Sequence, residues 1–113
     1  MKKSRLIVLL PILIVLALSL SASLQQSPTF VIVNSQRVFE SSNKGQQILK
    51  MKDADAGKKA VQEFRSEVVT TIESMAKDRG YDLVLDFASA GVVYFNPAVD
   101  ITDEVIRRIN QLY

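Results

Sequence analysis

The stretch that decides the fold is KKAVQEFRSEVVTTIESMAKDRGYDLVLDF, residues 58–87, because its hydrophobic period changes once, at a glycine. Before Gly80, apolar residues recur at steps of three and four and lay one stripe along a helix. They are Val61, Phe64, Val68, Ile72 and Met75. Gly80 favours the left-handed backbone that ends a helix, and Lys77 and Arg79 complement the helix dipole there. After it, the β-branched and aromatic run at 83–87 predicts a strand.

Downstream, a second β-prone run occupies residues 92–95, after a turn at 88–91. The spacing predicts an antiparallel hairpin between 83–87 and 92–95. Thr102 then offers an N-cap for a final helix. The apolar stripe of that helix is Val105, Ile106, Ile109 and Leu112.

Upstream, residues 30–34 are short, uncharged and rich in β-branched side chains, which predicts a buried first strand. Asn34 and Ser35 offer a cap for a short helical turn at 35–40. The polar run at 41–43 then indicates a break and a second cap.

The region from Asn43 to Arg79 is expected to form a helical hairpin with unequal limbs. An amphipathic piece at 46–51 precedes a turn at 53–57, and the helix resumes at Lys58. At about 1.5 Å per residue, the outgoing limb is about 15 Å long and the return limb about 33 Å.

The expected order of strand, two helical segments, two strands and a helix is an α+β fold with a small three-stranded sheet. A chain this short buries only about 60% of its unfolded surface, so its core is thin. Strands that are apolar on both faces are therefore expected to be covered by other subunits. The alternative is that the first strand and the last helix cover both faces within one chain. The expected interface residues are Phe30, Ile32, Leu83, Leu85, Val93 and Phe95.

The N-terminus has the pattern of a secretory signal peptide. Positive residues at 2, 3 and 5 precede an uncharged aliphatic run at 6–20, and small residues follow at 21–23. We expect cleavage after Ser23 and an exported chain of residues 24–113. The run is short for a spanning helix, and an uncleaved anchor is the alternative.

The composition excludes several classes of site. The chain has no cysteine and no histidine, so it has no disulfide, no thiol or imidazole nucleophile and no Cys/His zinc site. Removing residues 1–23 takes away three of the 14 Lys and Arg and none of the 12 Asp and Glu, which leaves a formal charge of −1. That balance gives no general attraction for nucleic acid. Asp82 and Asp86 could act as an acid–base pair, but strand-end carboxylates more often bind turns, and no catalytic residue, metal or cofactor is expected.

Three segments resemble the Skp/OmpH family of periplasmic chaperones. They are GYDLVLD at 80–86, VVYFNP at 92–97 and VDITDEVI at 99–106. The first strand with residues 34–39, and the helix entry at 43–45, are similar to that family's opening. The likeness extends over most of the exported chain.

The resemblance implies an exported, non-enzymatic protein that forms homotrimers around a shared β-barrel body. In that family, long helical hairpins enclose unfolded outer-membrane proteins without ATP, cofactor or metal. Here the arm is confined to about residues 43–79, so residues 24–113 are expected to form the family's body with a truncated arm.

Two functions from different classes follow. The first is a periplasmic holdase for unfolded outer-membrane β-barrel proteins, with client contacts near the hairpin tip. The second is an armless trimeric structural or adaptor module of the cell envelope. The expected client-facing residues, which could instead zip the two limbs together, are Ile48, Leu49, Met51, Val61 and Phe64.

Overall fold

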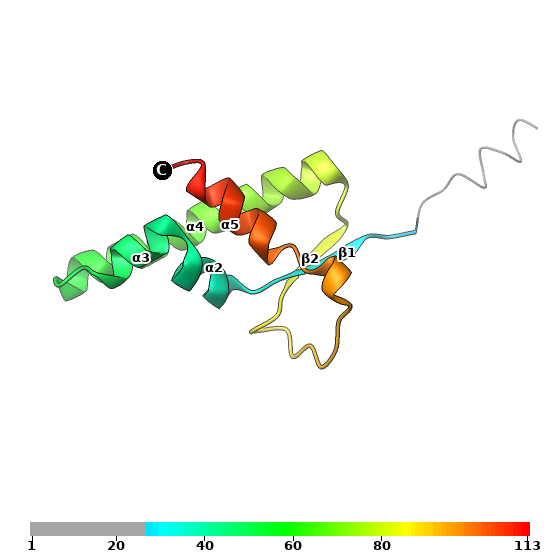
Figure 1. Cartoon of the computed structure of the whole chain (residues 1–113), viewed down its shortest axis with the longest axis horizontal. Coiled ribbons are helices and arrows are strands. Elements are labelled where there is room, and N and C mark those ends of the chain that lie inside the picture. Colours follow the sequence, from blue (N-terminus) through cyan, green and yellow to red (C-terminus); the bar gives the residue numbers. More distant parts are fainter. Residues whose placement is uncertain (1–26) are drawn as a thin grey trace, which may run out of the picture.

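The computed structural model describes residues 27–113, and the expected signal peptide lies outside them. The described chain is α+β, as the sequence predicted (Figure 1). Its elements in chain order are β1 (Phe30–Val33), α2 (Ser35–Ser41), α3 (Asn43–Leu49), α4 (Ala54–Arg79), β2 (Leu83–Asp86), the 3-10 turn η1 (Pro97–Val99) and α5 (Thr102–Asn110).

The two strands pair in parallel, with Phe30 opposite Leu83 and Val33 opposite Asp86. Parallel strands need a long crossover connection, and α2, α3 and α4 together provide it. On its other edge, β1 forms a bridge between Ile32 and Asp100. β1 therefore has a backbone neighbour on each edge, strand β2 on one and the single bridge to Asp100 on the other.

The prediction of a third strand was wrong. Residues 92–95 form no strand, and the predicted hairpin with β2 is absent from the described residues. The reason is the route of the chain: after β2 it must reach the far edge of β1, where Asp100 bridges Ile32. The segment between these points loops away from the sheet (Figure 1).

Short polar side chains begin the helices where the sequence indicated. Asn34 accepts from the Arg37 amide at the start of α2, and Ser42 accepts from the Gly45 amide at the start of α3. Gly80 closes α4 in the left-handed conformation, at φ 72°. These caps confirm three of the boundaries predicted from the sequence.

The hairpin turn differs from the prediction. Asp53 is the N-cap of α4 and accepts from two amides of its first turn, so Gly57 lies inside the helix and not in the turn. At about 1.5 Å per residue, α3 is about 10 Å long and α4 about 39 Å. The outgoing limb is shorter, and the return limb longer, than predicted.

Gly45 permits the close contact between α2 and α3. A Cβ atom at this position would lie 1.7 Å from the Phe39 carbonyl oxygen, which is backbone and cannot move aside cheaply. At Gly57, by contrast, a Cβ would meet nothing within 4 Å. The two glycines therefore serve different purposes, although both lie in helices.

We expect Gly45→Ala to lower the free energy of unfolding by about 3 kcal/mol or more, because the helices must separate to admit the methyl group. Gly57→Ala should raise it by about 0.5–1 kcal/mol, because alanine favours a helix interior. Urea unfolding followed by circular dichroism measures both. Equal effects of the two substitutions would contradict this account.

The core lies between the sheet and the four helices α2, α3, α4 and α5 of the described chain. The stripe predicted along α4 packs inward, and Phe64, Val68 and Met75 are buried. Phe64 meets Phe39 of α2 edge to face, with ring centroids 5.8 Å apart. The remaining buried apolar side chains of the cluster are Val31, Val33, Val38, Ile48, Ile101, Val105 and Ile109.

Thr102 joins the start of α5 to the end of β1, and it is fully buried. Its hydroxyl donates to Asp100 and accepts from the Asn34 amide at 2.9 Å. The predicted N-cap role of Thr102 is therefore corrected: Ile101 is the cap position, and the Asp100 carboxylate accepts from the Thr102 amide.

Thr102→Val is expected to destabilise the protein by about 1–3 kcal/mol, because it leaves the Asn34 amide without its acceptor in a part-buried site. Thr102→Ser keeps the hydroxyl and should recover most of this loss. Thermal unfolding of the two variants beside the parent compares them. A cost of Thr102→Val no larger than that of Thr102→Ser would contradict this account, because valine keeps the methyl group and loses only the hydroxyl.

Candidate binding surface

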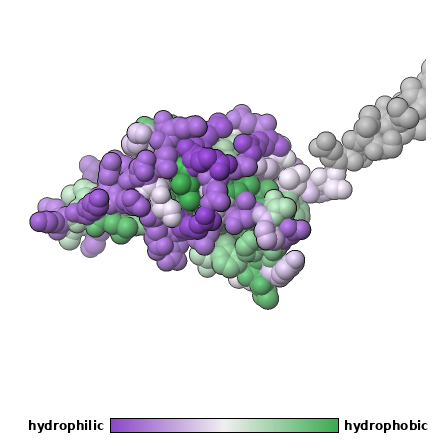
Figure 2. Space-filling view, viewed as in Figure 1, coloured by the Kyte–Doolittle hydropathy of each residue, from purple (hydrophilic) through white to green (hydrophobic). Residues whose placement is uncertain are grey.

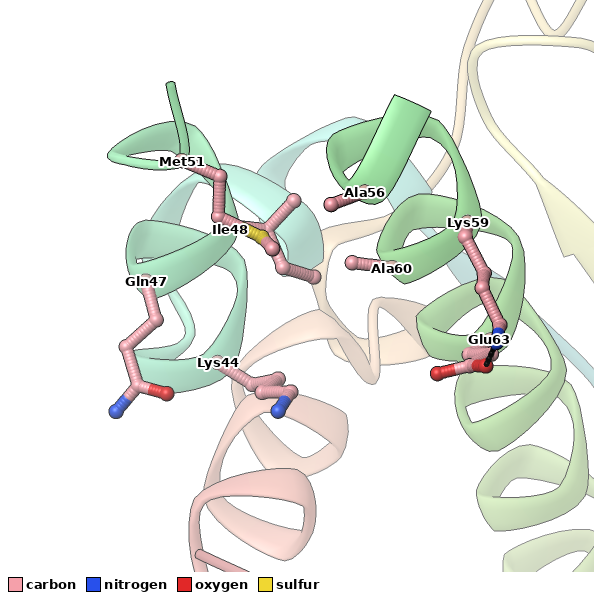
Figure 3. Close-up of a pocket in the computed structure, with 8 residues that line it drawn as sticks. All are labelled: Lys44, Gln47, Ile48, Met51, Ala56, Lys59, Ala60 and Glu63. Carbon is pink, nitrogen blue, oxygen red and sulfur yellow. Dashed lines mark ion pairs between the residues drawn. The ribbon is translucent and has the colours of Figure 1, made fainter. Parts of the chain in front are cut away.

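An open groove lies at the free end of the hairpin, between α3 and the first turns of α4 (Figure 3). Its volume is about 480 Å³. The residues that line it are Lys44, Gln47, Ile48, Met51, Ala56, Lys59, Ala60 and Glu63. Figure 3 shows the long side chains of both helices around the two alanines.

Two alanines one turn apart leave the groove open. Ala56 and Ala60 lie on the same face of α4, since residues four apart in a helix are neighbours. Ile48 and Met51 approach them from the α3 side, and Met51 keeps 45% of its surface exposed. The groove thus offers a shallow apolar floor and a flexible thioether, which adapts to differently shaped partners.

Charged side chains surround the groove, and their interactions with neighbouring groups are weak. Lys59 and Glu63 form an ion pair at 4.0 Å along α4 (Figure 3), which is worth about 0.3–0.5 kcal/mol at an exposed site. The Lys44 ammonium lies 4.9 Å from the centre of the Tyr113 ring. Both cations can swing aside at little cost, so the rim does not close the groove.

The five client-facing residues predicted from the sequence divide into two groups. Leu49 and Met51 are exposed, at 61% and 45%, and Val61 is half-buried. Ile48 and Phe64 are buried and belong to the core. Their burial favours the alternative, in which these residues zip the two limbs of the hairpin together, although Ile48 also lines the groove.

The residues predicted for a subunit interface also differ in exposure. Ile32 is buried within the chain, so it is not a surface residue of this protomer. Leu85 and Phe95 are half-buried. The other three, Phe30, Leu83 and Val93, are exposed.

A second groove, of about 610 Å³, runs between α4 and β2. Its apolar walls include Val69, Ile72 and Val84, and its polar residues include Arg65 and Asp86. This surface was not found from the sequence, because it depends on how α4 crosses the sheet. Ser35, which binds Asp86 beside it, was noted only as a helix cap.

Asp82 and Asp86 tie strand ends to neighbouring segments. Asp82 accepts from the Thr29 amide at 2.7 Å, and Asp86 accepts from the Ser35 hydroxyl at 2.5 Å and its amide at 3.2 Å. Burial acts to raise the pKa of Asp86, but the hydrogen bonds from Ser35, Ala88 and Ser89 outweigh it and hold the pKa below its usual value. These bonds give both carboxylates structural roles in place of an acid–base pair.

Because the pKa of Asp86 is lower in the folded chain, its contribution to stability is present above the unfolded pKa and is lost as pH falls through the folded value. We expect Asp86→Asn to cost about 1 kcal/mol at pH 7 and progressively less below about pH 4. Urea unfolding between pH 2.5 and 7 measures this difference. Glu73→Gln is the control, and a cost for Asp86→Asn that does not change with pH would contradict the expectation.

Two classes of site are not found between residues 27 and 113. No helix there is long and apolar enough to cross a membrane. The same residues hold no group of three or more acidic side chains placed to bind a metal ion.

Comparison with known proteins identifies one family. A family model described as "Outer membrane protein (OmpH-like)" matches residues 49–109. The match runs from the end of α3 through α4 and β2 to the last turn of α5, so it includes the α4 side of both grooves. No curated protein matches the chain.

Proposed function

The chain belongs to the OmpH-like family, whose model matches more than half of it, and from this premise we propose that it is an ATP-independent periplasmic holdase for unfolded outer-membrane β-barrel proteins. The family consists of non-enzymatic periplasmic chaperones that bind unfolded outer-membrane proteins and are generally trimeric. The proposal for this chain includes export by residues 1–23 and assembly as a homotrimer.

The observation that carries the proposal is the exposed apolar surface at the hairpin tip. Met51 lines the groove beside Ala56 and Ala60, Leu49 is 61% exposed at the end of α3, and neither belongs to the buried core. Such a surface suits many weak and exchangeable contacts with a disordered chain. It does not suit one tight site of fixed shape.

Holding by this surface depends on several copies acting together. One exposed leucine and one methionine contribute about 1–3 kcal/mol each when fully covered, which is too little to retain a client. Three tips on one body raise the effective concentration of the second and third contacts, so that avidity exceeds the affinity of each tip. With α3 only seven residues long, the tips enclose little space, and the client is expected to remain largely outside the assembly.

We expect the double variant Leu49→Asp, Met51→Asp to lose the ability to delay aggregation of an outer-membrane protein diluted out of denaturant. Both side chains are exposed, so the fold should persist, while the new charges reject apolar client segments. Light scattering at equal numbers of chaperone trimers and clients measures the delay.

Leu112→Asp is the matched control, because Leu112 is also 61% exposed but lies beyond α5, away from the tip groove. It should delay aggregation as the parent does. If the double variant and the control delay aggregation equally, the hairpin tip does not contact the client, and the proposed mechanism is wrong.

A second function, an adaptor module of the cell envelope, is favoured by the burial of Ile48 and Phe64. Two of the five apolar residues near the tip are buried in the core. On this alternative, the short hairpin stabilises the fold and does not contact clients. On this account the parent protein does not delay aggregation even at several-fold excess, but it captures one folded envelope partner. The same scattering experiment therefore separates the two functions.

A further inference from the structure

The groove at the hairpin tip has two unlike ends. Its outer end, beside the turn between α3 and α4, is formed by Met51 and Ala56 (Figure 3). Its inner end, on the side of the body, is formed by Lys44 and Glu63 (Figure 3). Figure 2 shows apolar colour at the tip, on the left, and hydrophilic residues over most of the helices behind it. The inner end is therefore the polar end of the groove.

Tyr113, which follows α5, places its ring against this inner end. Its hydroxyl donates to the Glu67 carboxylate, one turn of α4 beyond Glu63. On the other limb, the Lys44 ammonium lies 4.9 Å from the centre of the ring. The ring therefore lies between one side chain from each limb of the hairpin, and one of the two, Lys44, also lines the groove.

The two partners of the ring suit an aromatic side chain that carries a hydrogen-bond donor. A cation is attracted to the π face of an aromatic ring, and a carboxylate accepts from a phenolic hydroxyl or an indole N–H. Lys44 and Glu67 are both half-buried, so the helices hold the pair in place. Leucine satisfies neither partner, and phenylalanine satisfies only the cation. The site therefore selects tyrosine and tryptophan.

Tyr113 is held weakly enough for another ring to replace it. The residue remains 49% exposed, and its hydrogen bond to Glu67 is exposed as well. An exposed cation–π contact shifts a population only about two- to fivefold. The end of α5 is fixed separately, because the Asn110 side chain accepts from the Asn43 amide at 2.9 Å. The ring can therefore leave its place while the helix stays docked.

Outer-membrane β-barrel proteins are rich in the side chains that this site selects. Their strands carry girdles of aromatic residues at both membrane interfaces, where tryptophan and tyrosine are enriched. Before such a protein folds, these rings are exposed within segments that alternate between apolar and polar residues. One segment can cover Ala56 and Ala60 with its apolar side chains while its ring reaches the inner end of the groove.

We propose that the space between Lys44 and Glu67 is a subsite for a tyrosine or tryptophan side chain of an unfolded outer-membrane protein, and that Tyr113 occupies it until a client replaces it. The inference rests on the proposed function and adds a side-chain preference to it. Tyr113 acts as an internal competitor. It covers the subsite in the free protein and lowers the affinity for aromatic segments, because only molecules with the ring displaced are competent to bind them.

Dye-labelled peptides of alternating valine and serine, with tyrosine, phenylalanine or leucine at one central position, measure the preference by fluorescence anisotropy. Tyr113→Ala removes the competitor, so it should tighten binding of the tyrosine peptide about three- to sixfold and leave that of the leucine peptide unchanged. Leu112→Ala is the matched control, because Leu112 is exposed beside Tyr113 but does not line the groove. It should change the binding of neither peptide.

The two partners are tested in the Tyr113→Ala background, where the self-contact is gone. Lys44→Met removes the cation and keeps an apolar stem, and it should weaken binding of the tyrosine peptide about two- to fivefold. Lys59→Met is its control, because Lys59 lines the same groove but pairs with Glu63, and it should leave this binding unchanged. Glu67→Ala removes the acceptor, so it should abolish the difference between the tyrosine and phenylalanine peptides.

Other outcomes also decide the matter. If Tyr113→Ala strengthens binding of the tyrosine and leucine peptides equally, or of neither, the subsite does not exist. A changed light-scattering mass of Tyr113→Ala alone assigns the ring to contact between copies and overturns the inference as well. Delayed aggregation by the parent without an aromatic preference leaves the proposed holdase standing and refutes the subsite. An aromatic preference without the delay supports the subsite and refutes the holdase.

Discussion

The structure depends on β1 having neighbours on both edges. Its buried residues Val31, Ile32 and Val33 face layers that come from later parts of the chain. β2 pairs on one side, and the Ile101 amide donates to the Ile32 carbonyl on the other at 2.9 Å. All elements between the two strands form the crossover, and α5 begins where the second edge is occupied. A four-residue strand thus fixes both the hairpin and the last helix.

The local features of this fold follow from the sequence. The stripe of α4, its end at Gly80 and the caps at Asn34 and Ser42 rest on interactions within a few residues, which periodicity and side-chain chemistry report directly. The hairpin turn was misplaced because Gly57 weakens a helix without ending it, whereas Asp53 caps one. Strand pairing was wrong for a different reason: alternation identifies a strand but does not name its partner, so residues 83–87 and 92–95 were paired by proximity alone.

The candidate surface could be predicted only in part. Apolar residues near the tip were identifiable, but their exposure depends on how α3 and α4 rotate about each other. That rotation buries Ile48 and Phe64 and leaves Leu49 and Met51 outside. The groove itself arises from Ala56 and Ala60, whose small size becomes visible only beside the neighbouring helix. The open edge of β2 results from its parallel pairing with β1. This pairing joins segments far apart in the sequence, so no local sequence pattern predicts it.

The crossover also determines the order in which the chain can fold. Thr29 meets Asp82 across 53 positions, and Asn34 meets Thr102 across 68. Synthesis from the N-terminus produces β1 before β2 and Asp100, so this strand has no partner until most of the chain has been made. Contacts so distant slow folding, because a long loop must close before any of them forms. During that interval β1 is an unpaired apolar segment in an incomplete chain. Segments of this kind aggregate unless another protein covers them.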